Sequence, residues 1–103
     1  MNDKIKQEIE HLINGHKVFL FMKGTPDNPE CGFSMKVVTI IKSFHIEFGY
    51  CNIFEDEEIR QGVKEYADWP TIPQLYINGK FIGGSDITEE LYKSGKLKKL
   101  IEE

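Results

Sequence analysis

The sequence predicts one α/β domain, residues 1–103, with a four-stranded mixed sheet that carries helices on both faces. Three observations lead to this prediction. Residues 17–22 form a continuous apolar run, which is typical of a strand buried on both faces of a sheet with parallel pairs. Helical and strand patterns alternate along most of the chain and end in a hairpin signal. A length of 103 residues is also that of a single domain.

The first elements follow from the spacing of apolar residues. Such residues recur at helical spacing up to about residue 14, which predicts an amphipathic helix that Gly15 ends. The apolar run at 17–22 is rich in β-forming residues and is the first strand. Residues 23–30 are dense in turn formers and are expected to be a loop. Apolar positions then resume at helical spacing through 33–44 as a second helix.

A second strand is expected over residues 48–54, directly before an acidic segment. Residues 55–58 read Glu-Asp-Glu-Glu, and acidic side chains suit the positive end of a helix. We therefore expect a third helix that reaches about Ala67, and we interpret the acidic residues as its solvated start rather than as a metal site.

The last third of the chain predicts a hairpin followed by a helix. Residues 74–78 and 80–82 are short strand patterns joined by Asn78-Gly79, the strongest short hairpin signal. A helix should begin at about Ser85 or Asp86, and Gly95 is expected to break it into two.

Composition excludes several classes of protein. The net charge of −4 argues against a duplex nucleic-acid binder, which needs a basic surface. No apolar run approaches the ~20 residues that a membrane span needs. Two cysteines are too few for a disulfide-rich secreted scaffold. The 12% of aromatic residues argues against disorder.

The beginning of the chain shows no targeting signal. Residues 1–6 lead straight into a helical pattern of mixed charge, with neither an apolar stretch nor a cleavage site. An Arg- and Ser-rich organelle leader is not seen either. We therefore expect the cytoplasm or a mitochondrial or other organellar matrix.

Cys31 is the strongest candidate for chemistry, because it lies between the 23–30 loop and the start of the second helix. Unpaired N–H groups and the positive end of the helix dipole favour the thiolate there. Lys23, at the end of the first strand, adds a positive charge. The alternative is an inert buried thiol, which is common for cysteine.

Ser34 stands where a dithiol redox motif would have its second cysteine, and a hydroxyl cannot resolve a mixed disulfide. Its alternative role is that of an early-helix serine bonded to the backbone. Cys51 lies in the second predicted strand and is interpreted as a buried structural thiol. A role as a distant resolving cysteine is less favoured, since a central strand would not deliver it to the end of the sheet.

Four motifs follow one another at consistent spacing. They are Lys23-Gly24-Thr25-Pro26, Cys31-Gly32-Phe33-Ser34, Trp69-Pro70-Thr71-Ile72-Pro73 and Gly83-Gly84-Ser85-Asp86. With them, the chain resembles the monothiol, CGFS-type glutaredoxins from about Ile5 to Ile101. This resemblance implies a thioredoxin-like fold, which agrees with the order of elements described above.

The resemblance also implies a glutathione site. Pro73 is expected to be the cis-proline of the fold, which leaves the Ile72 backbone to pair with the cysteinyl residue of glutathione, beside Thr71. The backbone N–H groups of Ser85 and Asp86 should hold the γ-glutamyl carboxylate, and Asp86 should pair with its amine.

Two alternatives remain open at this site. Asp86-Ile87-Thr88-Glu89 also fits a capping box, a role that is compatible with ligand binding. Lys23 and Arg60 match positions that hold the glycine carboxylate in the family, although Arg60 alone would be interpreted as a solvated helix residue.

Two functions follow from the resemblance. The first is assembly and transfer of a [2Fe–2S] cluster, which prefers four thiolates. Cys31 supplies one thiolate per chain, so two chains and two glutathiones complete the set in a bridged homodimer. The apo form is expected to be a monomer. Apo iron–sulfur proteins are the expected recipients of the cluster. The alternative is glutathione-dependent thiol–disulfide exchange with a single cysteine, of at most weak activity. An inert thioredoxin-like interaction module is the third and least favoured reading.

Overall fold

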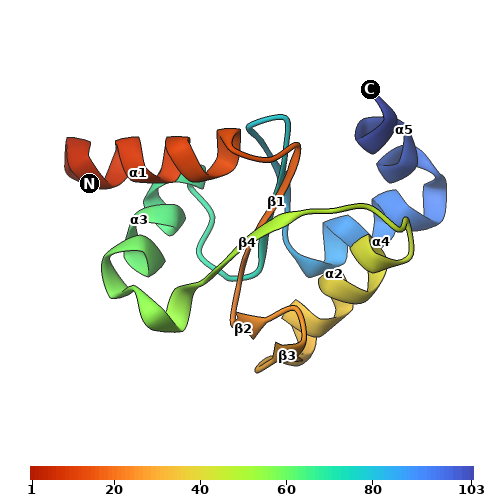
Figure 1. Ribbon diagram of the computed structural model, residues 1–103, viewed down its shortest axis with the longest axis horizontal. Helices are drawn as coiled ribbons and strands as arrows, with labels where there is room; N and C mark the ends of the chain where they lie inside the picture. Colours follow the sequence, from red (N-terminus) through yellow and green to blue (C-terminus); the bar gives the residue numbers. More distant parts are fainter.

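A four-stranded sheet in the order β4-β1-β5-β6 forms the centre of the computed structural model, which describes residues 1–103 (Figure 1). β1 (Val18–Met22) is parallel to β4 (Gly49–Asn52) and antiparallel to β5 (Gln74–Ile77). β5 is antiparallel to β6 (Lys80–Gly83). The sheet is mixed, as the sequence predicts.

Helices cover both faces of this sheet (Figure 1). One face carries α1 (Asp3–Asn14) and α3 (Glu57–Ala67), which pack against each other. The other carries α2 (Gly32–Lys42) and α4 (Ser85–Ser94), and α5 (Lys96–Glu102) packs against α4. This is the thioredoxin-like arrangement that the resemblance to the monothiol glutaredoxins implies.

β1 is the strand that both halves of the core share, since all five of its residues are buried. Val18, Leu20 and Met22 belong to the apolar cluster beneath α2 and α5. Phe19 and Phe21 belong to the cluster beneath α1 and α3. Successive side chains of a strand point to opposite faces, so an unbroken apolar run serves two cores at once.

The acidic segment does start a helix. The Asp56 carboxylate accepts a hydrogen bond from the Ile59 N–H at 3.1 Å, and Glu57 and Glu58 lie in the first turn of α3.

The hairpin signal is confirmed as well, because Asn78 and Gly79 have φ of 53° and 76°. Gly95, with φ of 82°, separates α4 from α5 as expected. None of the helices has the length and apolar character needed to cross a membrane.

Two regions differ most from the prediction. The expected loop at 23–30 contains a small hairpin of β2 (Gly24–Thr25) and β3 (Asn28–Pro29). The second strand ends at Asn52, and a 3-10 turn, η1 (Ile53–Glu55), takes the place of its last residues. Both changes involve the Asn52 side-chain oxygen, which accepts hydrogen bonds from the N–H groups of Gly24 at 3.0 Å and Phe54 at 3.1 Å.

Candidate functional site

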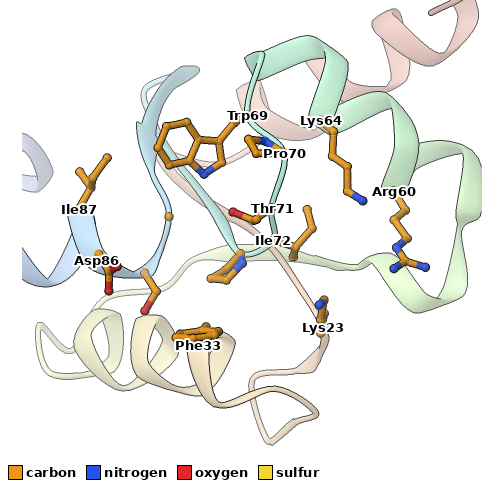
Figure 2. Close-up of a pocket in the computed structure, with 13 residues that line it drawn as sticks. Lys23, Phe33, Arg60, Lys64, Trp69, Pro70, Thr71, Ile72, Asp86 and Ile87 are labelled. Atoms are coloured by element: carbon orange, nitrogen blue, oxygen red, sulfur yellow. The ribbon is translucent and has the colours of Figure 1, made fainter.

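A cavity of about 520 Å³ lies between α3, the segment before β5 and the start of α4 (Figure 2). All six residues expected to bind glutathione line it. They are Lys23, Arg60, Thr71, Ile72, Ser85 and Asp86. These residues come from four separate parts of the chain, so it is the fold that brings them together.

The segment before β5 forms the floor of this cavity. The peptide bond between Ile72 and Pro73 is cis, as expected, and both residues line the cavity. The ladder between β1 and β5 begins at Gln74, so Ile72 lies outside it. The Gln74 amide donates to the carbonyls of Trp69 at 3.2 Å and Thr71 at 3.3 Å, which holds the segment in shape.

Cys31 occupies the N-cap position of α2 and is partly exposed. The Ser34 N–H does most to lower the pKa of this thiol, and burial opposes it only in part. The Phe33 N–H and the charge of Lys23 lower the pKa further. These influences are the ones expected at a helix N-terminus. Cys31 is not itself a lining residue of the cavity, although Phe33, two positions later, is one.

Ser34 is fully buried, and its hydroxyl accepts a hydrogen bond from the Lys23 N–H at 3.1 Å. Ser34 therefore has the alternative role of a serine bonded to the backbone, although its partner lies at the end of β1 and not in its own helix. The contact joins the end of β1 to the first turn of α2. It thus fixes Lys23 close to the helix start that Cys31 caps.

One end of the cavity is lined by cations. Figure 2 shows Arg60 and Lys64 extending from α3 on the same side as Lys23. Arg60 is only partly exposed, its Nε is buried without a partner, and its Nη1 lies 3.6 Å from the Glu57 carboxylate. Arg60 is therefore a partly buried residue at the cavity wall rather than a fully solvated one. Sequence reasoning missed Lys64, although its place one helical turn after Arg60 was a usable signal.

The other end of the cavity is the N-terminus of α4. Gly84 is the N-cap and supplies no side chain to cap the helix. Asp86 is the second helical residue, and its carboxylate is 92% exposed, 3.9 Å from Lys36 Nζ. The capping-box interpretation is therefore wrong, because the helix begins one residue before Asp86. The first N–H groups of α4 have no partner within the helix, and the Asp86 carboxylate is exposed beside them with one long ion pair to Lys36.

Apolar side chains that the sequence analysis did not assign complete the walls. Phe33 lines the cavity and is 60% exposed, and Ile87 lies on the α4 side. The indole of Trp69 packs against Phe81 with ring centres 5.6 Å apart. Trp69 and Phe33 both lie within the four motifs quoted above. That membership is the sequence signal that could have identified them as cavity residues.

Cys51 differs from the expectation in two ways. β4 is an edge strand, since the order is β4-β1-β5-β6, and the thiol is half-buried rather than fully enclosed. Burial, with added repulsion from Asp56, Glu55 and Glu8, raises the pKa of Cys51 to about 11. The two cysteines therefore have opposite tendencies, and only Cys31 is favoured as thiolate. The chain gathers no group of three or more His, Cys, Asp or Glu side chains that could hold a metal ion.

Comparison with known proteins gives consistent matches. Residues 18–82 match the Glutaredoxin family model. The chain is 51% identical to "Uncharacterized monothiol glutaredoxin ycf64-like" of Synechocystis, over 99% of this chain and 95% of the relative. It is 52% identical to "Monothiol glutaredoxin-S14, chloroplastic" of Arabidopsis thaliana, over 99% of this chain but 59% of that longer protein.

Solved structures agree with these sequence matches. The solution structure of reduced poplar apo GrxS14 is 55% identical, with a TM-score of 0.84 over 95% of this chain and 90% of that one. A monomeric truncated mutant of Trypanosoma brucei 1-C-Grx1 is 35% identical, with a TM-score of 0.85 over 94% and 88% of the two chains. The chain therefore belongs to the glutaredoxin family and, within it, to the monothiol glutaredoxins.

Proposed function

We propose that this protein binds glutathione in the cavity and, as a glutathione-bridged homodimer, carries a [2Fe–2S] cluster to apo iron–sulfur proteins. The observation that carries the proposal is the charge arrangement of the cavity. Cations line one end, and a helix N-terminus with an exposed carboxylate, Asp86, lines the other. Glutathione has a carboxylate at each end and an ammonium group beside one of them, which matches this pattern.

Each end of glutathione has chemically suitable partners. Lys23 and Arg60 are chemically suited to hold the glycine carboxylate, and Lys64 adds a third cation at this end. The N–H groups of Ser85 and Asp86 suit the γ-glutamyl carboxylate, and the Asp86 side chain suits the ammonium. A volume of about 520 Å³ falls within the usual range of small-molecule sites.

The middle of the ligand is assigned to the backbone before β5. Because the β1–β5 ladder begins at Gln74, the backbone of Ile72 is available to pair with the cysteinyl residue as an added strand would. Thr71 lies beside it at the cavity surface. This pose directs the ligand thiol toward the start of α2, where Cys31 lies.

The thiolate count supports a bridged homodimer. A [2Fe–2S] cluster prefers four thiolates, and Cys31 is the cysteine favoured in that form. Two chains and two glutathione molecules supply the set of four. Cys31 suits this role because it is partly exposed and its pKa is lowered. The cluster is the cargo of the protein, and the apo form is proposed to be a monomer.

A second candidate function is thiol–disulfide exchange, which the lowered pKa of Cys31 favours. The Cys31 thiolate attacks the glutathione sulfur of a mixed disulfide and releases the substrate as a thiolate. A second glutathione thiolate then attacks the Cys31–glutathione disulfide, which releases oxidised glutathione and restores the Cys31 thiolate. Ser34 offers no resolving thiol, and β2–β3 lies between Lys23 and Cys31, so we propose at most weak activity.

Relatives suggest where the protein acts. One is named chloroplastic in Arabidopsis thaliana, and another is named mitochondrial in Schizosaccharomyces pombe. We propose the cytoplasm or an organellar matrix for this chain.

Anaerobic reconstitution with iron and sulfide, followed by visible absorbance, tests the main proposal. The chromophore should appear when reduced glutathione is present and should be absent when glutathione is replaced by dithiothreitol. S-Methylglutathione, which keeps both carboxylates but lacks the free thiol, is the matched control and should not support the chromophore. A chromophore of equal intensity without glutathione would contradict the bridging arrangement.

A further inference from the structure

Two polar atoms at the α4 end of the cavity are buried without a hydrogen-bond partner. They are the indole Nε1 of Trp69 and the hydroxyl of Ser85, a residue that is 8% exposed. Both residues line the cavity. Buried polar groups in proteins are nearly always paired, so each exception needs an explanation. A ligand that enters the cavity is the simplest source of the missing partners.

The indole N–H lies beside the N-terminus of α4. A Cβ added to Gly84, the N-cap of that helix, would lie only 3.3 Å from Trp69 Nε1, so the indole nitrogen lies close against the Gly84 backbone. Figure 2 shows the nitrogen edge of the Trp69 ring directed into the space that Thr71 and Asp86 border. An atom held by the first N–H groups of α4 is therefore within reach of the indole.

The position of the indole is set before any ligand binds. Its ring packs against Phe81, and its backbone N–H donates to the Lys64 carbonyl at 3.0 Å. The Trp69 carbonyl accepts from the buried Gln74 amide at 3.2 Å. A side chain fixed at its ring and at its backbone loses little freedom when it forms one more hydrogen bond.

The indole N–H of Trp69 determines which kind of chemical group can be its partner. An indole N–H can only donate, so its partner is an acceptor. The first turn of α4 adds further N–H donors and the positive end of a helix dipole, which together favour an anion. The cations Lys23, Arg60 and Lys64 line the opposite end, so the two carboxylates of glutathione separate, one to each end.

We propose that Trp69 is a specificity-determining residue whose indole N–H donates a hydrogen bond to the α-carboxylate of the γ-glutamyl residue of glutathione. This inference rests on the proposed glutathione site and adds a donor to it. The α4 N-terminus and the indole hold the same carboxylate from two directions. The ammonium group beside that carboxylate then faces Asp86. Trp69 therefore recognises the γ-linked amino acid rather than the rest of the peptide.

Trp69 is the only tryptophan in the chain, so a ¹H–¹⁵N correlation spectrum contains one indole cross-peak. The reduced protein is titrated with reduced glutathione and, separately, with 4-aminobutyryl-cysteinyl-glycine, which lacks only the α-carboxylate. We expect the indole proton to move downfield with glutathione and to stay in place with the analogue. An equal shift with both peptides, or no indole shift while the Ser85 and Asp86 amides move, would overturn the inference.

A variant gives a second, independent measurement. Trp69→Phe keeps an aromatic ring against Phe81 and removes the N–H. We expect glutathione affinity to fall about tenfold, as for loss of one charge-assisted hydrogen bond. Affinity for the analogue should stay the same, which also shows that the variant is folded. Equal loss for both peptides would mean that the ring only supports the cavity, and would overturn the inference.

The two proposals fail differently in these experiments. If the wild-type protein does not bind glutathione, the proposed function fails and this inference falls with it. If the wild type binds glutathione and Trp69→Phe binds it equally well, only the role of the indole is refuted. Gly84→Ala adds a Cβ 3.3 Å from the indole nitrogen and should also weaken glutathione binding more than analogue binding.

Discussion

The Ser34 hydroxyl accepts a hydrogen bond from the Lys23 N–H at 3.1 Å, which couples the end of β1 to the first turn of α2. The N–H of the same serine does most to lower the pKa of Cys31. Ser34 is therefore a structural residue of the site and not merely the place where a second thiol is missing. The hydroxyl that prevents intramolecular resolution also holds Lys23 near the thiol.

Ser34→Ala should lower the free energy of unfolding by about 1 kcal/mol, since the Lys23 N–H loses its acceptor at a buried position. Urea denaturation measures this change. Ser94→Ala is the matched control, because the Ser94 hydroxyl donates to the Leu91 carbonyl at an exposed site. Equal stability of Ser34→Ala and Ser94→Ala would contradict a structural role for the Ser34 hydroxyl.

Cys51 should make stability depend on alkaline pH. Burial raises the pKa of its thiol from 9.0 to about 11, so the folded state holds this proton more tightly than the unfolded state. The resulting stability is complete below pH 9.0 and is lost as pH rises toward about 11. We expect the wild type to lose more stability than Cys51→Ser between these two pH values. Identical pH profiles of thermal unfolding would show that the thiol titrates alike in both states.

The same contrast between the two cysteines predicts which one would bind the proposed cluster. Cys31→Ser should abolish the visible absorbance of the reconstituted protein, because it removes the thiol that is favoured as thiolate. Cys51→Ser should retain the absorbance and serves as the matched control. A folded Cys51→Ser protein that fails to assemble the chromophore would rule out Cys31 as the sole protein ligand.

Oligomeric state should follow the cluster. In the proposed arrangement two chains and two glutathiones together supply four thiolates, so the holo protein is expected to elute as a dimer in anaerobic gel filtration. The apo protein should elute as a monomer, and removal of iron by a chelator should convert one into the other. A holo protein that elutes as a monomer with its chromophore intact would exclude bridging.

The elements and the reactive cysteine could be predicted because each depends on local sequence. The Asn78-Gly79 turn, the break at Gly95 and the thiol before a helix are read from neighbouring residues. The edge position of β4 could not be predicted in this way, because strand order is set by pairing between distant segments. The incorrect prediction that Cys51 lies in a central strand has this cause.

Side-chain contacts between distant parts of the chain could not be predicted either. Asn52 bonds both Gly24 and Phe54, which ends β4 early, and nothing in the local pattern indicates a contact with residue 24. Lys64 reaches the cavity only because α3 presents it on the same side as Arg60. The six expected binding residues do meet in one cavity, but their grouping came from resemblance to a family rather than from periodicity.

Arg60 should set glutathione affinity rather than folding stability. Its guanidinium is partly buried at the cationic end of the cavity, with Nε unpartnered and a weak contact of 3.6 Å to Glu57. Arg60→Ala should weaken glutathione binding by about tenfold, or about 1.4 kcal/mol. The free energy of unfolding should change by less than about 0.5 kcal/mol, since such ion pairs contribute little.

Cluster lifetime offers the sharper measurement, because two of the four proposed ligands arrive on glutathione. We would follow decay of the holo absorbance at several glutathione concentrations for the wild type, Arg60→Ala and Lys93→Ala. Lys93 is a 74% exposed cation on α4 outside the cavity, so Lys93→Ala matches the loss of one positive charge. Arg60→Ala should need about tenfold more glutathione for the same lifetime, as for loss of a charged hydrogen bond. Superimposed curves for all three proteins would show that Arg60 does not contact the ligand, whatever its place at the cavity.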